Sequence, residues 1–564
     1  MSPSNVPIPE SRSASEADGL AALAADSRTA AIWTLVSRIT GVGRVVAIGA
    51  VLGPTYFGNL FQTLNILPNI VHVMLVGQLI TALLVPALVR HLDLRDQGGA
   101  DRLANGFLGT IVLVASVVIG LCILADSLVL DLITAAVADS HIRASQMRLG
   151  WPLLVMLLPQ IILYAVAATA VAVQQAHRKF ALPAAAPALE NIGTIAVMGA
   201  SAWLYGTGRD VNDVTAPQLI LIGVGSTAAV GLHAAAQWWG AYRLGIALVP
   251  RAGWRNSEVH QVIRLAIPSS GYAALNSITF LGLLVVAGAV PGGAVAFQIG
   301  FNFFSLPIAL GAHPAAAALL PRLSRGFDQG NEAAMYSIYR DSLAIASFVA
   351  LPASFLFVSL PVTLAQAVSF GEMASLAGIS LVAAAIGGLG LGVLGEAAFT
   401  VSTSAAYACR DAISPFRATV LRALIAFVGM AFALIALQGV AIIWALGLSY
   451  SAASLIAAVY LYRRQVRLGS QQLPERHSRF LGDLAASAIA VVPGWLIAHL
   501  LDGALAYQFA GVLVGLAAIA ASGLTYLFVQ WWRGSREFTA LFSIINRPRT
   551  EGAAVRNPVE GTGK

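Results

Sequence analysis

The sequence predicts an all-α polytopic membrane protein with fourteen transmembrane helices, and three observations support this fold class. Hydrophobic residues make up 58% of the 564 residues and charged residues only 10%, and the mean hydropathy is +0.79. A chain this apolar has too little polar surface to be a soluble globular protein. Fourteen apolar segments are long enough to cross a bilayer, and the basic residues gather at alternate ends of these segments.

The order of the segments along the chain predicts the organisation of the protein. Residues 1–28 are rich in Ser, Pro, Glu and Ala and have no apolar stretch after a basic start, which predicts a disordered cytoplasmic tail and not a cleaved signal peptide. Residues 536–564 are predicted to form a second cytoplasmic tail. The predicted spans between the tails are 29–52, 57–89, 104–128, 148–174, 183–205, 217–242, 262–287, 294–321, 341–368, 376–406, 415–437, 440–462, 480–501 and 507–531.

The distribution of Lys and Arg predicts the orientation of the chain. With the N-terminus in the cytoplasm, 28 of the 33 basic residues fall in the tails and cytoplasmic loops, and only Arg143, Arg148 and Arg209 fall outside. Cytoplasmic loops of membrane proteins carry the excess of basic residues. Both termini are therefore predicted to be cytoplasmic, and the number of spans is predicted to be even.

An internal duplication divides the spans into two similar sets. Three features recur at a nearly constant offset along the chain: Leu67-Pro68 with Leu306-Pro307, Pro86 with Pro321, and Arg178 and Pro183 with Arg410 and Pro415. Parallel repeats of this kind are typical of transporters, whose substrate path lies between the halves. We therefore predict a six-helix bundle over 29–245, a second one over 246–465, and an accessory helix pair over 466–535.

Two arginines within the first predicted span give the strongest functional signal. Arg38 and Arg44 are the only charges between Ala30 and Leu52, and they lie roughly 12 Å and 21 Å into the helix at about 1.5 Å of rise per residue. A buried Arg costs about 2.5–3.5 kcal/mol on insertion scales, so the pair predicts a water-filled cavity or an anionic partner. Their spacing turns the helix by roughly 240°, which predicts one wide cavity and not a narrow stripe. The alternative for Arg38 is that its long side chain reaches the nearer membrane surface.

Several short motifs occur in an informative order along the first twelve spans. They are Ser37-Arg38-Ile39-Thr40-Gly41 with Arg44, Leu52-Gly53, Leu67-Pro68-Asn69, Val85-Pro86, His177-Arg178-Lys179-Phe180 with Pro183, Ala186-Pro187 with Leu189 and Asn191, Pro307 with Leu320-Pro321, Ala350-Leu351-Pro352, and Tyr407 with Arg410-Asp411 and Pro415. In this order and spacing they resemble the lipid II flippases of the MurJ (MviN) family, in the MOP exporter superfamily. Fourteen helices is also the number typical of that family.

The resemblance implies a V-shaped pair of bundles that alternates between inward-open and outward-open states. It implies a substrate with an undecaprenyl-type lipid and a diphosphate-linked sugar headgroup, bound in a cationic cavity with arginines on spans one, two and eight. Arg38 and Arg44 match the first-span pair, but His72 and Asn302 stand at the other two positions. Asn is neutral and His titrates near neutrality, so the cavity has fewer fixed positive charges than the family implies. Either Arg38 and Arg44 hold the diphosphate with help from His72, or the substrate is a different lipid-linked glycan.

Further polar residues lie within the predicted spans. Gln62 and Asn65 are expected to line the cavity, although such residues serve equally to hold helices together. Glu396 is expected to be neutral or paired, and it is a candidate site for coupling to a proton or cation, the alternative being a water pocket beside a glycine-kinked helix. Glu190 lies near the start of the fifth span, where helix capping is the favoured interpretation.

Three charged residues at predicted cytoplasmic ends of spans are candidates for a gate. They are Arg178, Arg410 and Asp411. The simpler interpretation is that they set the topology and contact lipid headgroups.

No enzyme activity, cofactor or metal is predicted. The sequence contains no P-loop, nucleophile elbow or metal-ligand cluster, and its two cysteines, Cys122 and Cys409, fall in or beside different apolar segments. The leading hypothesis is a flippase of the bacterial plasma membrane for a lipid II-like cell-envelope precursor, with membrane lipids and envelope-synthesis enzymes as partners and no nucleic acid. The alternatives are an ion-coupled exporter of small amphipathic molecules, similar to the MATE proteins of the same superfamily, and a non-transporting scaffold for envelope synthesis.

Overall fold

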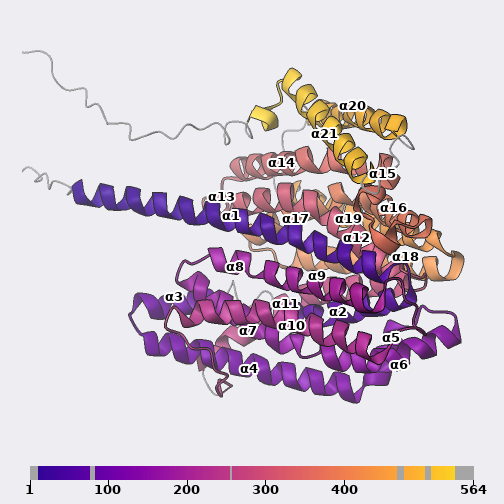
Figure 1. The fold of residues 1–564 in the computed structure, drawn as a ribbon. Coiled ribbons are helices and arrows are strands. Elements are labelled where there is room, and N and C mark those ends of the chain that lie inside the picture. The colour runs from indigo at the N-terminus through magenta and orange to yellow at the C-terminus, as the bar shows by residue number, and fades with distance from the viewer. Residues whose placement is uncertain (1–9, 77–82, 255–256, 467–475, 502–509, 540–564) are drawn as a thin grey trace, which may run out of the picture.

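The protein consists of long helices that lie side by side and run in roughly one direction through the molecule (Figure 1). The structure is a computed structural model that describes residues 10–76, 83–254, 257–466, 476–501 and 510–539. These residues form helices and no strand. The predicted all-α class is confirmed.

The first ten helices make up the N-terminal half. Short breaks divide several of the predicted spans, and Pro187 begins one of the resulting helices, because a proline fits the first turn, where its missing N–H has no partner in the helix. The helices are α1 (Glu10–Leu52), α2 (Tyr56–Val76), α3 (Val85–Asp93), α4 (Gln97–Leu124), α5 (Asp126–Ile133), α6 (Ser140–Leu157), α7 (Gln160–Ala176), α8 (Ala181–Ala185), α9 (Pro187–Tyr205) and α10 (Ala216–Tyr242).

The next helices make up the C-terminal half. A π-helical turn, η2, follows Pro307, as expected where a proline interrupts the backbone hydrogen bonds of a long helix. The elements are α11 (Ser257–Ala287), α12 (Gly293–Pro307), η2 (Ile308–Ala312), α13 (His313–Asp328), α14 (Glu332–Ser359), α15 (Pro361–Val368), η3 (Gly371–Ala374), α16 (Leu376–Gly390), α17 (Gly392–Ala408), α18 (Ile413–Ala436) and α19 (Val440–Val466).

The last two helices lie outside both halves. α20 (Arg476–Leu501) packs on α21 (Ala510–Trp532) and on α14, and α21 packs on α15. The pair, yellow in Figure 1, therefore covers the side of the C-terminal half that faces away from the N-terminal half. The predicted boundaries between the tails, bundles and accessory pair stay predictions.

Eleven described helices are long and apolar enough to span a membrane, or twelve if α16 and α17, bent by 46°, form one span. Two predicted spans are missing from this count. For 57–89, α2 ends at Val76 and residues 77–82 lie outside the described residues. For 262–287, only Gly271–Ala287 qualifies, as a shorter apolar helix. The number fourteen therefore stays a prediction.

The predicted disordered tail is wrong from Glu10 onward. Helix α1 begins at Glu10 and continues without a break to Leu52. The reason is that this polar stretch contains strong helix formers, including the run Ala-Ala-Leu-Ala-Ala at 21–25, which continue the first span backwards. Residues 1–9 lie outside the described residues.

The ends of α7 and α17 share one backbone geometry, which supports the internal duplication. Arg178 and Arg410 both adopt a left-handed conformation, with φ of 59°. The N–H of the next residue then bonds back to a carbonyl of the preceding helix, Lys179 to Gln174 and Asp411 to Ala406. This is a Schellman cap that recurs at equivalent places in the two halves.

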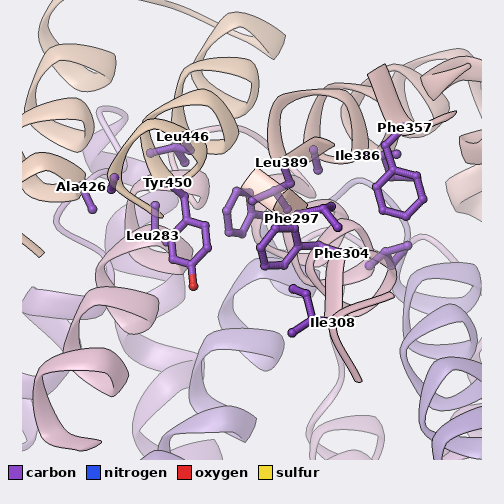
Figure 2. Packing of buried hydrophobic residues seen from close by; sticks show 14 of the residues in the cluster. Leu283, Phe297, Phe304, Ile308, Phe357, Ile386, Leu389, Ala426, Leu446 and Tyr450 are labelled. Carbon is purple, nitrogen blue, oxygen red and sulfur yellow. The ribbon is translucent and has the colours of Figure 1, made fainter. Parts of the chain in front are cut away.

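One large cluster of buried residues, with a smaller one beside it, forms the core of the C-terminal half. Figure 2 shows Phe297 and Phe304 of α12 packed among aliphatic side chains, with the hydroxyl of Tyr450 directed away from them. Small residues bring the helices close: a Cβ at Gly447 of α19 would lie 2.7 Å from the carbonyl carbon of Gly388 in α16. Such close contact holds helices together in lipid, where there is little hydrophobic driving force between them.

Helix α1 runs between the two halves. It packs on α8 and α9 of its own half and on α12 of the other, and α2 packs on α11 and α12. We call the end where α1 begins and α19 ends the tail end. The other end, where Gly53–Thr55 join α1 to α2, is the turn end. Arg38 and Arg44 of α1 therefore lie on the helix that runs along the boundary between the halves.

Candidate functional site

A cavity of about 420 Å³ lies between the two halves, on the tail-end side of Arg44. Its walls come from α1, from the break between α8 and α9, and from α12 with the turn that follows it. The lining residues are Thr34, Ser37, Arg38, Gly41, Val42, Arg44, Pro183, Ala184, Pro187, Asn302, Ser305, Leu306 and Ala309. Arg38, Arg44 and Asn302, predicted from the sequence, thus lie around one space.

Arg44 reaches from α1 to a carboxylate on α9. One nitrogen of its guanidinium donates to Glu190 Oε1 at 2.7 Å. The hydroxyl of Tyr164 on α7 donates to the same oxygen at 2.9 Å, and Nδ1 of His233 on α10 lies 3.1 Å from Oε2. Four helices of the N-terminal half therefore meet at Glu190.

A second, smaller cavity of about 120 Å³ lies behind Arg44, toward the turn end. Among its lining residues are Arg44, Glu190, Tyr164 and the two predicted residues of α2, Gln62 and Asn65. Arg44 lines both cavities and forms part of the wall between them. Gln62 donates to the amide oxygen of Gln298 on α12 at 3.4 Å and so joins the two halves.

His72 and Asn302, which the resemblance places where arginines are expected on the second and eighth spans, have different surroundings. Asn302 lines the larger cavity, although its amide nitrogen is bonded to the Gln298 carbonyl one turn earlier, at 2.8 Å. His72 lines neither cavity; its ring packs on Tyr164, with 5.5 Å between ring centroids. Nδ1 of His72 is buried and has no hydrogen-bond partner among the described residues. His72 therefore lies beside the Glu190 cluster and not in the cavity wall.

The turn end holds the two halves together. Asn59 on α2 donates to the Val290 carbonyl at 2.7 Å and accepts from the Ala294 N–H at 3.0 Å. Thr207, after α9, donates to the Glu372 carboxylate of η3 at 2.6 Å. These contacts close the boundary between the halves on this side, so the larger cavity lies on the tail-end side of a closed barrier.

Glu396 belongs to a separate cluster inside the C-terminal half. Nη1 of Arg422 on α18 lies 2.8 and 2.7 Å from the two carboxylate oxygens of Glu396, and Ser454 donates to one of them at 2.9 Å. The Arg422 guanidinium also donates to Asn276 of α11 and lies 4.5 Å from the ring centre of Phe399. Glu396 is therefore paired, and its role in ion coupling stays a prediction.

The predicted gate residues Arg178, Arg410 and Asp411 lie at the tail end, after α7 and α17. Arg410 pairs with Asp328 at the end of α13, at 2.9 Å, and Asp411 lies 3.8 Å from Arg464 at the end of α19. Both pairs stay within the C-terminal half, so they do not join the halves, and the gating role stays a prediction. Burial raises the pKa of Asp411, but hydrogen bonds from Ser414 and Ile413 and the nearby Arg464 outweigh it, and the net pKa lies below the ordinary 3.8.

A different contact joins the halves at the tail end. His91 on α3 has a carboxylate at each ring nitrogen, Asp96 at 3.1 Å and Glu258 of α11 at 3.0 Å. Arg90 pairs with the same Glu258 at 3.3 Å. This contact is not predicted from the sequence, because the residues are far apart in the chain and each looks like an ordinary loop charge.

Two residues of the buried clusters, Glu190 and Arg422, have surroundings that differ from those predicted from the sequence. Glu190 is interpreted above as a capping residue; that is wrong, because its carboxylate is bound by three side chains from other helices. The charge count places Arg422 on the cytoplasmic side, whereas the structure buries it inside the bundle. The available signal was the repeat, because Arg422 follows Glu190 at the same offset at which Arg410 follows Arg178.

The model of the family described as "Lipid II flippase MurJ" matches residues 48–515. A probable lipid II flippase MurJ of Synechocystis sp. is 24% identical over 392 residues, which are 69% of this chain and 72% of that protein.

Two kinds of solved structure share the fold. A lipid II flippase MurJ in an inward closed conformation has a TM-score of 0.69 and 17% identity, over 92% of this chain and 99% of that one. An inward-facing multidrug resistance MATE family transporter of the MOP superfamily has a TM-score of 0.61 and 15% identity, over 78% of this chain and 96% of that one. An outward-facing MATE structure has a TM-score of 0.51, with 79% of this chain and 97% of that one covered at 15% identity.

Proposed function

The chain belongs to the lipid II flippase MurJ family, and on that premise we propose that it moves a polyprenyl-diphosphate-linked cell-envelope precursor across the membrane. It is a multi-pass protein of the bacterial membrane. The observation that carries the proposal is the meeting of Arg38, Arg44 and Asn302 around one cavity between the halves.

The chemistry of the cavity suits a diphosphate. A guanidinium is always charged and binds phosphate oxygens with two parallel hydrogen bonds. Arg38 and Arg44 lie on one helix and line the same space, so each can take one phosphate of a headgroup while the lipid tail stays in the bilayer. Asn302 adds a neutral amide on the opposite wall.

The arrangement of the halves supports transport by alternating access. The turn end is held closed by Asn59 and by the Thr207–Glu372 contact, and the cavity lies on the other side of that barrier. A site between two halves that is closed on one side is what a carrier of this type requires in one of its states. We place both termini in the cytoplasm on the distribution of basic residues, which makes this an inward-side cavity.

Native mass spectrometry of the purified protein tests the proposal. The wild type should retain a polyprenyl-diphosphate glycolipid in preference to phosphatidylglycerol. Arg38→Ala and Arg44→Ala should each lower retention roughly tenfold or more, because each removes a charged partner of the phosphates. Arg340→Ala is the matched control, since Arg340 is a half-buried arginine of α14, paired with Asp341 and outside the cavity lining.

The outcomes separate the proposal from its alternatives. Equal retention by the wild type and both cavity variants would refute the assignment of the cavity. Export of small amphipathic cations without glycolipid retention would favour a MATE-like exporter. Stable capture of envelope-synthesis enzymes with no flipping in liposomes would favour a scaffold.

A further inference from the structure

The two halves carry acid–arginine clusters at equivalent places, but the charges are arranged differently. Glu396 follows Tyr164 at the same offset at which Arg422 follows Glu190. In the N-terminal half the acid is on α9 and its arginine, Arg44, comes from α1. In the C-terminal half the acid is on α17, and the arginine, Arg422, stands at the position of Glu190. Only in the N-terminal half, therefore, is the arginine that pairs with the acid also a residue of the cavity wall.

The C-terminal pair is enclosed. The side chain of Arg422 is 7% exposed and that of Glu396 is 16% exposed. Arg422 is close to both carboxylate oxygens and lies against the rings of Phe399 and Tyr450. These neighbours occupy the guanidinium, so a ligand has little access to it. An enclosed pair with this geometry is expected to persist, because breaking it leaves a buried charge.

The N-terminal pair is open on one side. The side chain of Arg44 is 29% exposed, against 10% for Glu190. Arg44 uses one nitrogen to bond Glu190, and its Nε, although buried, has no hydrogen-bond partner among the described residues. Glu190 has two further partners, Tyr164 and His233, that do not depend on Arg44. The carboxylate would therefore keep two hydrogen-bonding neighbours if Arg44 turned toward the larger cavity.

We propose that Glu190 is a specificity-determining residue that competes with the substrate for Arg44. This inference rests on the proposed function, with a lipid diphosphate as the substrate headgroup. A ligand phosphate that takes the Arg44 guanidinium with two parallel hydrogen bonds competes with the carboxylate of Glu190 for the same charged group. The pair then selects headgroups by charge.

The selection follows from the balance of charges. A phosphodiester headgroup such as that of phosphatidylglycerol carries one negative charge. Its attraction to Arg44 can at best equal the attraction that Arg44 loses when it leaves Glu190. A diphosphate carries at least two charges and reaches Arg38 as well as Arg44. In a low-dielectric site such differences in charge are large compared with those in water. Specificity then comes from a built-in competitor that works against the abundant singly charged lipids.

The test is a comparison of affinities for two lipids in the full-length protein. Binding of farnesyl diphosphate and of phosphatidylglycerol is titrated by native mass spectrometry, with inorganic pyrophosphate as a third ligand that has the headgroup without a lipid. In Glu190→Gln the competing charge is gone, so phosphatidylglycerol should bind roughly tenfold more tightly, within the usual range of coupling between sites. The affinity for farnesyl diphosphate should increase less. The ratio of the affinity for farnesyl diphosphate to that for phosphatidylglycerol should therefore fall.

Asp483→Asn is the matched control. Asp483 pairs with Arg533 at 2.9 Å in the accessory helices, and its exposure of 15%, with 28% for Arg533, resembles that of the Glu190–Arg44 pair. This variant should leave both affinities unchanged. A shortened acid, Glu190→Asp, keeps the charge and should give an intermediate ratio.

The results distinguish the inference from the proposed function. If Arg44→Ala loses farnesyl diphosphate but Glu190→Gln keeps the wild-type ratio, the inference is overturned and the function stands. If Arg44→Ala binds like the wild type, the proposed site itself fails. A fall in the ratio in Asp483→Asn, or failure of both Glu190 variants to fold, would also overturn the inference, since Glu190 would then be only a structural counter-ion. If inorganic pyrophosphate binds as tightly as farnesyl diphosphate, the site selects diphosphate anions in general. The part of the inference that concerns lipids is then overturned.

Discussion

Arg44 and Arg422 place an arginine inside the membrane region in two different ways. Arg44 keeps one side toward a cavity, whereas Arg422 is covered by aromatic rings and paired with Glu396. Arg44 is visible in the sequence because it stands far inside an uncharged run. Arg422 cannot be recognised in the same way, because it lies close to the basic loop at Arg410, with Arg417 between the two arginines. The difference between a loop charge and a buried charge then depends on the partner, which lies on another helix.

Arg422→Leu should destabilise the protein strongly. Removing one member of a buried ion pair leaves Glu396 without its counter-ion, at a cost of about 3–5 kcal/mol. Thermal unfolding in detergent should show a large drop in midpoint. The double variant Arg422→Leu, Glu396→Leu should recover much of the loss, because no buried charge remains. An unchanged midpoint in the single variant would show that the pair contributes nothing to stability.

Asp411 should stabilise the start of α18 in a pH-dependent way. Its carboxylate accepts from the Ile413 and Ser414 N–H groups, and its folded-state pKa is lowered from 3.8. A depressed pKa means that the stabilisation is complete above pH 3.8 and is lost as the pH falls through the lower folded-state value. Asp411→Ala should therefore lower the unfolding midpoint at pH 7 by the equivalent of roughly 1 kcal/mol, the usual cost of losing such a cap. The gap to the wild type should narrow below pH 3.8; a constant gap across this range would contradict the assignment.

At the scale of the helix, the sequence predicts where elements exist better than how they end. Apolar length locates the spans, but the backward extension of α1 to Glu10 and the break between α16 and α17 are not visible in hydropathy. Propensity decides the first, since alanine continues a helix in a polar segment. For the second, the signal in the sequence is the group of glycines near Glu396, and the structure places glycines of α16 against α19.

Gly447→Val should disrupt the contact between α16 and α19. The added side chain would meet the backbone of Gly388, with its Cβ 2.7 Å from the carbonyl carbon, and backbone cannot move aside as a side chain can. Overpacking of this kind costs about 1–3 kcal/mol, which should lower the unfolding midpoint. Gly523→Ala on α21 is the control, because nothing among the described residues lies within 4 Å of its added Cβ. Helix propensity alone should raise the midpoint of Gly523→Ala slightly, because Ala is a better helix former than Gly. A loss of stability in both variants alike would show that the loss in Gly447→Val does not come from this contact.

At the scale of the molecule, the repeat predicts two similar halves but not their interface. The nearly constant offset aligns helix ends, and the shared cap at Arg178 and Arg410 supports it. The contacts that join the halves, such as that of His91 with Glu258, have no counterpart in any local pattern. These contacts depend on how the two halves are placed relative to each other. The cavity could be expected between the halves, beside Arg38 and Arg44, but the contacts that close it at the turn end could not be predicted.

Locking the turn end should separate binding from transport. Thr207 and Glu372 are in contact at 2.6 Å, so cysteines at these two positions, with Cys122 and Cys409 replaced, should react with a short bifunctional maleimide. Alternating access requires this end to open for release. The cross-linked protein should therefore bind a polyprenyl diphosphate with wild-type affinity but fail to move it across a liposome membrane.

Each single-cysteine variant treated with the same reagent provides the control, because it carries the modification without the link. Both should transport as the untreated protein does. If the cross-linked protein still transports, the Thr207–Glu372 boundary does not open during the cycle, and the lipid would have to cross by a path other than between the halves. If the link forms but binding is also lost, the cavity and the turn end are coupled more tightly than a rigid-body motion of two halves allows.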